Sequence, residues 1–227
     1  MLIYMLTIIP ALALALYAQY KVRSAYSRYS QVASSSQMTG AQVARQILDD
    51  HGLFNIGVEP VKGKLSDHYD PQAKVVRLSE ENYYGHSLAA TAIAAHEVGH
   101  ALQDAEDYAF LRFRHSLVPV ANFGTMAAFP LIIAGLFFGS FGSSLLLLGI
   151  ILFSAAVLFQ VITLPVEFNA SSRAMQQVVS AGIIRNEEER STRKVLDAAA
   201  LTYVAAALTA VLELLRLVYF FALSQQE

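Results

Sequence analysis

The sequence predicts a mainly α-helical integral membrane protein, with about four transmembrane helices and a small α+β domain outside the bilayer. Of its 227 residues, 55% are hydrophobic and only 15% are charged, whereas a soluble domain usually carries about 25% charged residues. Four apolar runs are close to the length of about 20 residues that a helix needs to cross a membrane. A longer polar segment, with mixed helical and extended patterns, separates the first run from the second.

The predicted spans cover residues 1–20, 116–138, 143–165 and 198–223. No Lys or Arg precedes the first apolar run, so we interpret this run as an uncleaved anchor and not as a signal peptide. We expect Pro165 to end the third span, because proline lacks the N–H that would continue the helical hydrogen-bond ladder.

Glu213 and Arg216 lie within the fourth span, three positions apart on one helix face. Charges inside a membrane are costly, and they are usually paired or face a cavity. The two residues could line a substrate path. The favoured interpretation is an ion pair packed against neighbouring spans.

Positive charge is concentrated in two segments. Of 16 Lys and Arg residues, ten lie in residues 21–115, five lie in residues 166–197, and one is Arg216. Because positively charged segments stay on the cytoplasmic side, we expect a multi-pass protein of the cytoplasmic membrane with both termini outside. Residues 21–115 and 166–197 would then be its two cytoplasmic regions.

The first cytoplasmic region begins with a Ser- and Gln-rich stretch at residues 30–38, which we interpret as a linker. Thr39 and Gln42 have the spacing of a capping box at the start of a helix. Gly52 is suited to the C-terminal end of that helix.

Residues 56–79 have an extended pattern that predicts a small pair of strands. Asp and Pro in residues 67–71 favour a turn between them. Residues 75–79 are expected to form an edge strand beside the helix predicted at residues 88–103.

That helix contains His96-Glu97-Val98-Gly99-His100. His96 and His100 are four positions apart, so both imidazoles project from one helix face and can bind one cation. This is the H-E-x-x-H pattern, in which the histidines bind zinc and the glutamate is the general base. The chain has no cysteine, so a metal must be bound by His, Asp or Glu. The alternative is a structural helix that carries two surface histidines.

Gly99 also belongs to this helix. Glycine costs about 1 kcal/mol relative to alanine in a helix interior. We therefore expect Gly99 to allow close packing.

A catalytic zinc site needs a third protein ligand. Glu106 would be carried away from the metal by the continuing helix, and His115 lies at the start of the second span. Residues 187–189 resemble the acidic charges of a helix start. Glu167 is best placed, because we expect it to open a second helix just below the membrane, close to where the chain that leaves the H-E-x-x-H helix enters the bilayer. Two helices joined to adjacent spans could then face each other across one cation.

Motifs along nearly the whole chain resemble one family. They are His-Glu-Val-Gly-His-Ala at residues 96–101, Leu-Pro-Val-Glu-Phe-Asn-Ala-Ser-Ser-Arg-Ala at 164–174, Met-Thr-Gly-Ala at 38–41, Leu-Ser-Asp-His-Tyr-Asp-Pro at 65–71, Val-Val-Arg-Leu-Ser at 75–79 and Val-Pro-Val-Ala-Asn-Phe-Gly at 118–124. By these motifs the chain resembles the YugP-type family of bacterial membrane zinc metallopeptidases. The resemblance implies Zn²⁺ as cofactor, a cytoplasmic gluzincin-like domain and peptidase activity in the bacterial inner membrane.

Residues 167–170 also resemble, more distantly, the Glu-x-x-Ala-Asp signature of HtpX-like and CaaX prenyl proteases. This resemblance implies that Glu167 is the third zinc ligand, beside His96 and His100. The Asp of that signature corresponds to Ser171 here, so whatever that Asp orients, such as a ligating histidine, must be held differently. Gluzincins commonly bind substrate as an added strand, which implies pairing along residues 75–79.

A second stabiliser of the tetrahedral oxyanion is also required. The candidates for this role, or for substrate binding, are His68, Tyr69 and Arg173, together with Tyr83 and Tyr84. Residues 67–71 are equally well explained as a turn, and Arg173 as a salt-bridge partner.

The sequence therefore predicts a membrane-embedded, zinc-dependent endopeptidase with Glu97 as its base. Expected partners are the lipid bilayer and protein or peptide substrates, with membrane proteins as one expected class. Nucleic acid is not an expected partner, because the net charge is −2 and no nucleic-acid module is evident. No sequence feature indicates an oligomeric state. The alternative is a catalytically inactive membrane scaffold that binds partner proteins.

Overall fold

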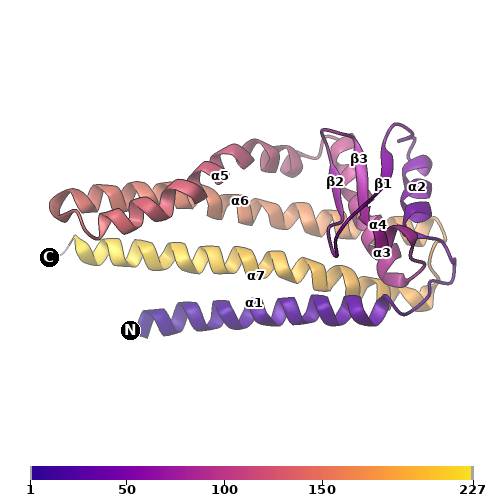
Figure 1. Ribbon diagram of the computed structural model, residues 1–227, viewed down its shortest axis with the longest axis horizontal. Coiled ribbons are helices and arrows are strands. Elements are labelled where there is room, and N and C mark those ends of the chain that lie inside the picture. The colour runs from indigo at the N-terminus through magenta and orange to yellow at the C-terminus, as the bar shows by residue number, and fades with distance from the viewer. Residues whose placement is uncertain (1, 226–227) are drawn as a thin grey trace. The chain divides into compact units, whose positions relative to one another are not determined.

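The computed structural model describes residues 2–225 and is mostly helical, with one small sheet (Figure 1). Met1, the first residue of the first predicted span, and the C-terminal residues 226–227 lie outside the described residues. The elements are α1 (Leu2–Tyr29), α2 (Gly40–Asp50), β1 (Gly57–Val61), β2 (His68–Asp70), β3 (Val75–Ser79), α3 (Glu80–Tyr84), α4 (Leu88–Ala105), α5 (Ala109–Gly135), α6 (Gly139–Ser180) and α7 (Asn186–Ser224).

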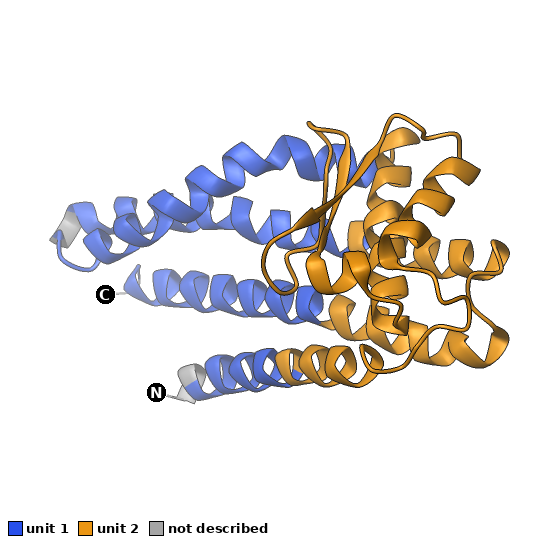
Figure 2. Cartoon of the chain, turned by 45° about the vertical axis from the view of Figure 1, so that its right-hand side comes forward, with its two compact units in different colours: residues 1–17, 109–165, 202–227 blue, residues 18–108, 166–201 orange. Residues whose placement is uncertain are grey.

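The chain divides into two compact units (Figure 2). Unit 1 contains residues 1–17, 109–165 and 202–227, and unit 2 contains residues 18–108 and 166–201. Helices α1, α6 and α7 each contribute residues to both units. All residues of the predicted H-E-x-x-H motif belong to unit 2.

Four described helices are long and apolar enough to cross a membrane: Met5–Tyr29, Ala109–Gly135, Phe141–Ser180 and Asn186–Ser224. Only 11% to 28% of each apolar window is buried inside the protein, so most of this apolar surface is available to lipid. The prediction of four apolar, membrane-crossing helices is thus in agreement with the structure.

Within unit 1, α5 and α6 pack closely through small residues. A Cβ atom added to Gly124 would lie 2.5 Å from the carbonyl oxygen of Leu152, so the two backbones nearly touch there. Ala128 and Ile150 belong to the buried apolar cluster of this unit. In α7, Arg216 donates a hydrogen bond to Glu213, which confirms that these two charges form an ion pair.

The expectation that Glu167 opens a second helix is wrong, because α6 continues through Pro165 to Ser180. A proline removes one helical hydrogen bond, but transmembrane helices tolerate this loss when neighbouring groups fix the chain. Here the residues that follow are fixed by α4: Gln103 donates a hydrogen bond to the carbonyl oxygen of Val166, at 2.8 Å. Tertiary packing therefore overrides the local helix-breaking preference.

The first predicted helix of unit 2 is present as α2. Thr39 and Gln42 form the complete capping box, in which each side chain bonds the backbone N–H of the other residue. Gly52 follows the end of the helix with a φ of +71°, a conformation that favours glycine.

The sheet has three strands in the order β1-β3-β2, so the prediction of a strand pair is wrong. β3 pairs in parallel with β1 and antiparallel with β2, which makes residues 75–79 the central strand and not an edge. Residues 68–70 form β2, and the turn comes after them, where Asp70 accepts hydrogen bonds from the backbone of residues 72 and 73.

Asp67 explains why the chain is extended where a turn was expected. Its carboxylate accepts hydrogen bonds from the backbone N–H and the hydroxyl of Ser79 and from the side-chain amide of Asn82. These bonds fasten the start of β2 to the end of β3, and they join residues that are 12 and 15 positions apart.

Residues 30–38 are firmly attached to the rest of unit 2 and do not behave as a free linker. The backbone N–H and the hydroxyl of Ser35 both donate to the carboxylate of Glu188. The N–H of Leu88, at the start of α4, donates to the carbonyl oxygen of Val32 at 2.9 Å. The segment thereby connects the end of α1 to the beginning of the motif helix.

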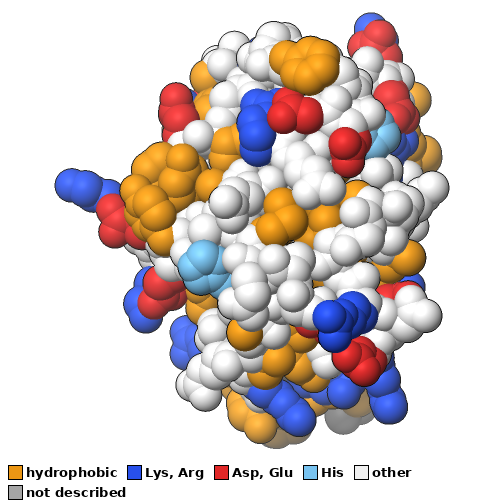
Figure 3. Space-filling model, turned by 90° about the vertical axis from the view of Figure 1, so that its right-hand side faces the viewer, with side chains coloured by type: hydrophobic (Ala, Val, Ile, Leu, Met, Phe, Trp, Pro, Cys, Tyr) orange, Lys and Arg blue, Asp and Glu red, His pale blue; other side chains and the backbone are white. Residues whose placement is uncertain are grey.

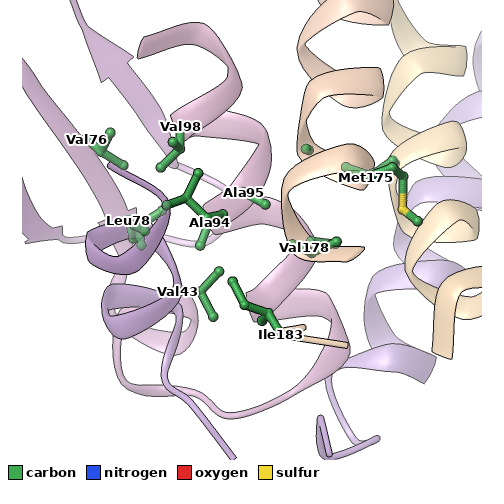
Figure 4. Close-up of a cluster of buried hydrophobic side chains, with 14 of the residues drawn as sticks. Val43, Val76, Leu78, Ala94, Ala95, Val98, Met175, Val178 and Ile183 are labelled. Atoms are coloured by element: carbon green, nitrogen blue, oxygen red, sulfur yellow. The ribbon is translucent and has the colours of Figure 1, made fainter. Parts of the chain in front are cut away.

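The hydrophobic core of unit 2 joins α2, β3, α4 and α6 (Figure 4). The labelled side chains come from these elements and from the segment after α6; they are Val43, Val76, Leu78, Ala94, Ala95, Val98, Val178 and Ile183, with Met175 on the side of α6 that faces α7. Because one face of α4 is packed into this core, its other side chains are held in fixed directions.

The face shown in Figure 3 carries acidic and basic side chains interspersed, without a continuous basic patch.

Candidate metal centre

Three side chains from two helices converge in unit 2. His96 and His100 project from α4 with their ring centroids 4.8 Å apart. α6 supplies Glu167, whose Oε2 lies 3.3 Å from Nε2 of His96 and 3.5 Å from Nε2 of His100. One ligand atom from each residue lies within 4.8 Å of the other two. The structure therefore brings together the three residues that the sequence analysis assigned to the metal.

The convergence depends on a close approach of α4 and α6 next to these side chains. A Cβ atom added to Gly99 would lie 2.6 Å from the carbonyl oxygen of Ala170, which is closer than real Cβ contacts. The small side chains of Ala95 and Ala174 are also fully buried in this core. The close packing expected for Gly99 is thus observed, and its partner is the helix that carries Glu167.

The donor set fits a zinc ion. Two imidazole nitrogens and one carboxylate are a ligand set found in catalytic zinc sites, which leave a further position for water or substrate. Glu167 has only 2% of its surface exposed, and a carboxylate is stable in such a place when cationic or hydrogen-bonding groups face it.

Each ligating ring is also held from its other nitrogen. Ser171 places its hydroxyl 3.1 Å from Nδ1 of His96, and Gln103 places its Oε1 3.0 Å from Nδ1 of His100. Both Nε2 atoms are thereby left to face Glu167. Ser171 therefore contacts a candidate metal ligand itself, which is one way in which such a ring can be held without an Asp at this position.

Gln103 was not among the residues singled out for the site. It is fully buried, and it contacts both the histidine and α6. Its spacing of three residues from His100 places it on the same helix face. That spacing is the sequence feature that could have identified it.

Glu97 is buried next to the candidate ligands, with 8% of its surface exposed. Burial raises the pKa of its carboxyl group, although the imidazoles of His96 and His100 act in the opposite direction. The nearby carboxylates of Asp67 and Glu167 add to the rise. A raised carboxyl pKa favours a group that accepts a proton during a reaction and later releases it.

The other third-ligand candidates do not belong to this three-residue group. α4 ends at Ala105, so the expectation that Glu106 continues the helix is wrong; the backbone N–H of Glu106 bonds the carbonyl oxygen of Leu102 as the helix closes. The Glu106 carboxylate lies 2.8 Å from Nη1 of Arg173. His115 lies in α5. Residues 187–189 form the first turn of α7, as expected of their charge.

The candidates for oxyanion or substrate binding have the following surroundings. The Tyr69 hydroxyl donates to Asp104 at 2.7 Å, and burial together with this bond raises the pKa of Tyr69. Arg173 bonds Glu106 and Asn169, as the salt-bridge interpretation requires. His68 has an exposed ring that contacts the carbonyl oxygen of Ser66. Tyr83 and Tyr84 contact each other edge to face.

Comparisons with known proteins place the chain in one family. Residues 4–222 match the model of a family described as "Putative neutral zinc metallopeptidase". The chain is 57% identical over 219 residues to a Bacillus subtilis (strain 168) protein named "Putative membrane protease YugP", and the match covers 96% of each chain. No solved structure matches the chain significantly.

The first testable prediction concerns the helix contact at Gly99. Gly99→Ala should gain helix propensity, but the added methyl group must displace Ala170. We expect a net loss of about 1–3 kcal/mol in the free energy of unfolding, which is typical of overpacking, and weaker zinc binding. Unfolding of the detergent-solubilised protein and its zinc content would measure both effects. A variant that is more stable and retains full zinc would show that the two helices can separate without cost.

Proposed function

We propose a zinc-dependent endopeptidase activity for this chain. The chain belongs to the family described as "Putative neutral zinc metallopeptidase" and is similar to the protein named "Putative membrane protease YugP". The family resemblance read from the motifs is thereby confirmed. The family and the four apolar helices also make the chain a membrane-associated protein. The observation that carries the proposed activity is the convergence of His96, His100 and Glu167, with Glu97 buried beside them.

His96 and His100 from one helix and Glu167 from a second would hold the zinc ion, in the arrangement typical of gluzincins. When bound, zinc supplies a Lewis acid that polarises the peptide carbonyl and acidifies water. Ser171 and Gln103 keep the two rings turned so that each Nε2 points to the common site. The buried position limits access of bulk water, which strengthens electrostatic interactions there.

Glu97 would act as the general base. Its carboxylate accepts a proton from the attacking water and then passes that proton to the nitrogen of the leaving amine. The raised pKa of Glu97 favours this second step, because the carboxyl group must hold the proton between the two transfers.

A peptide substrate could pair with the edge strand β2. Since β3 is central, β2 is bonded to one neighbouring strand only, and it lies at one edge of the sheet. Tyr69 in β2 donates to Asp104 in α4, which fixes this edge next to the motif helix. Recognition through backbone hydrogen bonds gives affinity with little sequence preference.

The metal and base assignments predict different outcomes for two substitutions. Glu167→Gln should remove most of the bound zinc, because a neutral amide is a poor ligand for it. Glu97→Gln should keep one zinc per chain but reduce casein cleavage by about 10²–10⁴-fold, the usual contribution of a general base. Metal analysis and cleavage assays on the same purified samples would measure both.

The matched control is Glu187→Gln, at an exposed position in the first turn of α7, which should change neither quantity. Full zinc content in Glu167→Gln would exclude Glu167 from the ligand set. A wild-type protein with neither zinc nor cleavage would support the inactive scaffold instead.

We further propose that both termini lie outside the cytoplasmic membrane and that the metal site faces the cytoplasm. This follows from the clustering of Lys and Arg in residues 21–115 and 166–197. The chain has no cysteine, so single introduced cysteines can report on each side. In intact cells a membrane-impermeant maleimide should label Gln225→Cys, at an exposed position just after α7, and it should label Glu187→Cys only after permeabilisation. Labelling in the reverse order would invert the topology.

Membrane proteins and their cytosolic tails are the proposed substrates. A substrate anchored in the same bilayer has a high effective concentration at the site, so its cleavage should exceed that of the soluble form by on the order of 10²-fold at equal bulk concentration. Proteoliposomes containing one cleavable sequence, with or without a transmembrane anchor, would test this. Equal rates for the two forms would refute the proposed preference.

A further inference from the structure

Gln103 makes three side-chain hydrogen bonds at a fully buried position. Its Nε2 lies 2.8 Å from the carbonyl oxygen of Val166 and 2.9 Å from Oδ1 of Asn169. Its Oε1 lies 3.0 Å from Nδ1 of His100. One amide group therefore joins a candidate metal ligand on α4 to the segment of α6 that carries Glu167.

The orientation of this amide is determined by its neighbours. A backbone carbonyl can only accept a hydrogen bond, so the NH₂ group of Gln103 must face Val166. Both hydrogens of that NH₂ group are used by Val166 and Asn169, and Oε1 is left as an acceptor directed at His100. The usual ambiguity between the amide oxygen and nitrogen is removed here by chemistry.

The same reasoning extends one residue further, to Arg173. The guanidinium group has only donors, and its Nε donates to Oδ1 of Asn169 at 2.7 Å. Oδ1 of Asn169 is therefore the oxygen, and it can accept from Gln103 as well. Arg173 itself is fixed by the Glu106 carboxylate, at 2.8 Å.

We propose that Gln103 is a positioning residue that sets the tautomer of His100. Because Oε1 accepts, Nδ1 of His100 must carry the proton, and the lone pair is then on Nε2, the atom that faces Glu167 and would bind the zinc ion. The ring donates to Gln103, and Gln103 donates to Oδ1 of Asn169, which also accepts from Arg173. Arg173 thus helps to fix the Asn169 oxygen that holds the Gln103 amide. The inference rests on the proposed function, since it concerns a ligand of the proposed zinc site.

A test can separate positioning from simple space filling. Gln103→Met keeps the volume but has no acceptor for Nδ1, so zinc affinity should fall by about 10–100-fold, the usual effect of losing such a partner. Gln103→Glu keeps an acceptor for Nδ1 but places a buried carboxylate against the Val166 carbonyl. Positioning therefore predicts the higher zinc affinity for Gln103→Glu and the higher thermal stability for Gln103→Met. If Gln103 only fills space, the variant with the higher thermal stability should also have the higher zinc affinity.

Two controls complete the design. Thr91→Val, on the same helix, alters a fully buried hydroxyl that has no hydrogen-bond partner, and it should leave zinc affinity unchanged. Asn169→Asp keeps the acceptor for Gln103 and adds a negative charge nearby, so it measures the effect of charge alone. Zinc affinity would be determined by chelator competition on the full-length protein in detergent, and stability by thermal unfolding of the metal-free protein.

The outcomes differ clearly. Positioning is supported if Gln103→Met loses more zinc affinity than Thr91→Val does. It also requires that Gln103→Glu binds zinc more tightly than Gln103→Met while Gln103→Met is the more thermally stable of the two. The inference is overturned if Gln103→Met binds zinc as tightly as the wild type. It is also overturned if the zinc affinity of Gln103→Glu exceeds that of Gln103→Met by no more than the affinity of Asn169→Asp exceeds that of the wild type. A wild-type protein that binds no zinc overturns both the inference and the proposed function. Zinc binding by the wild type with no effect at Gln103 overturns the inference alone.

Discussion

The close contact between α4 and α6 is the constraint on which the candidate site depends. His96 and His100 come from one helix and Glu167 from the other, so the three can meet only if the two backbones approach within a few ångströms. Gly99 and Ala170 allow this approach because neither has a side chain beyond Cβ. A helix rich in alanine and glycine loses apolar contact area, and the close packing compensates by adding van der Waals contacts between backbones.

A polar site within so apolar a chain must satisfy its own hydrogen-bonding groups. Gln103 is wholly buried, and both ends of its amide have partners. Asp67 performs a comparable role in the sheet, where it accepts hydrogen bonds from Ser79 and Asn82. A buried polar group without a hydrogen-bond partner costs free energy. These two networks therefore favour the one arrangement of unit 2 in which their groups are all bonded.

Features determined by neighbouring residues could be read from the sequence. The spacing of His96 and His100, the capping box at Thr39 and Gln42, and the apolar runs are all local. Glu167 could not be identified from local spacing alone, because Glu167 and His96 lie on two different helices. Its position after an apolar run and the family motif together indicated it. The sequence could not show that residues 75–79 are central, since this depends on pairing with two other strands.

Long-range contacts account for the other differences. Pro165 favours the end of a helix by itself, but the packing of Val166 and Ala170 against α4 keeps α6 continuous. Residues 30–38 have the composition of a linker, but Glu188, far along the chain, binds Ser35. The spacing of Gln103 from His100 indicates that the two share a helix face, but no sequence pattern shows that the Gln103 amide also bonds α6. In each case the decisive partner is remote in sequence.

The continuity of α6 restricts how this chain can change length during evolution. A loop can absorb an inserted residue, but an insertion within an uninterrupted helix turns everything beyond it by about 100° and shifts it by about 1.5 Å. Between Pro165 and Glu167 such a change would point the carboxylate away from His96 and His100. Gains and losses of residues should therefore accumulate in the connections on either side of α6, such as residues 181–185, and be absent from the stretch that carries Glu167.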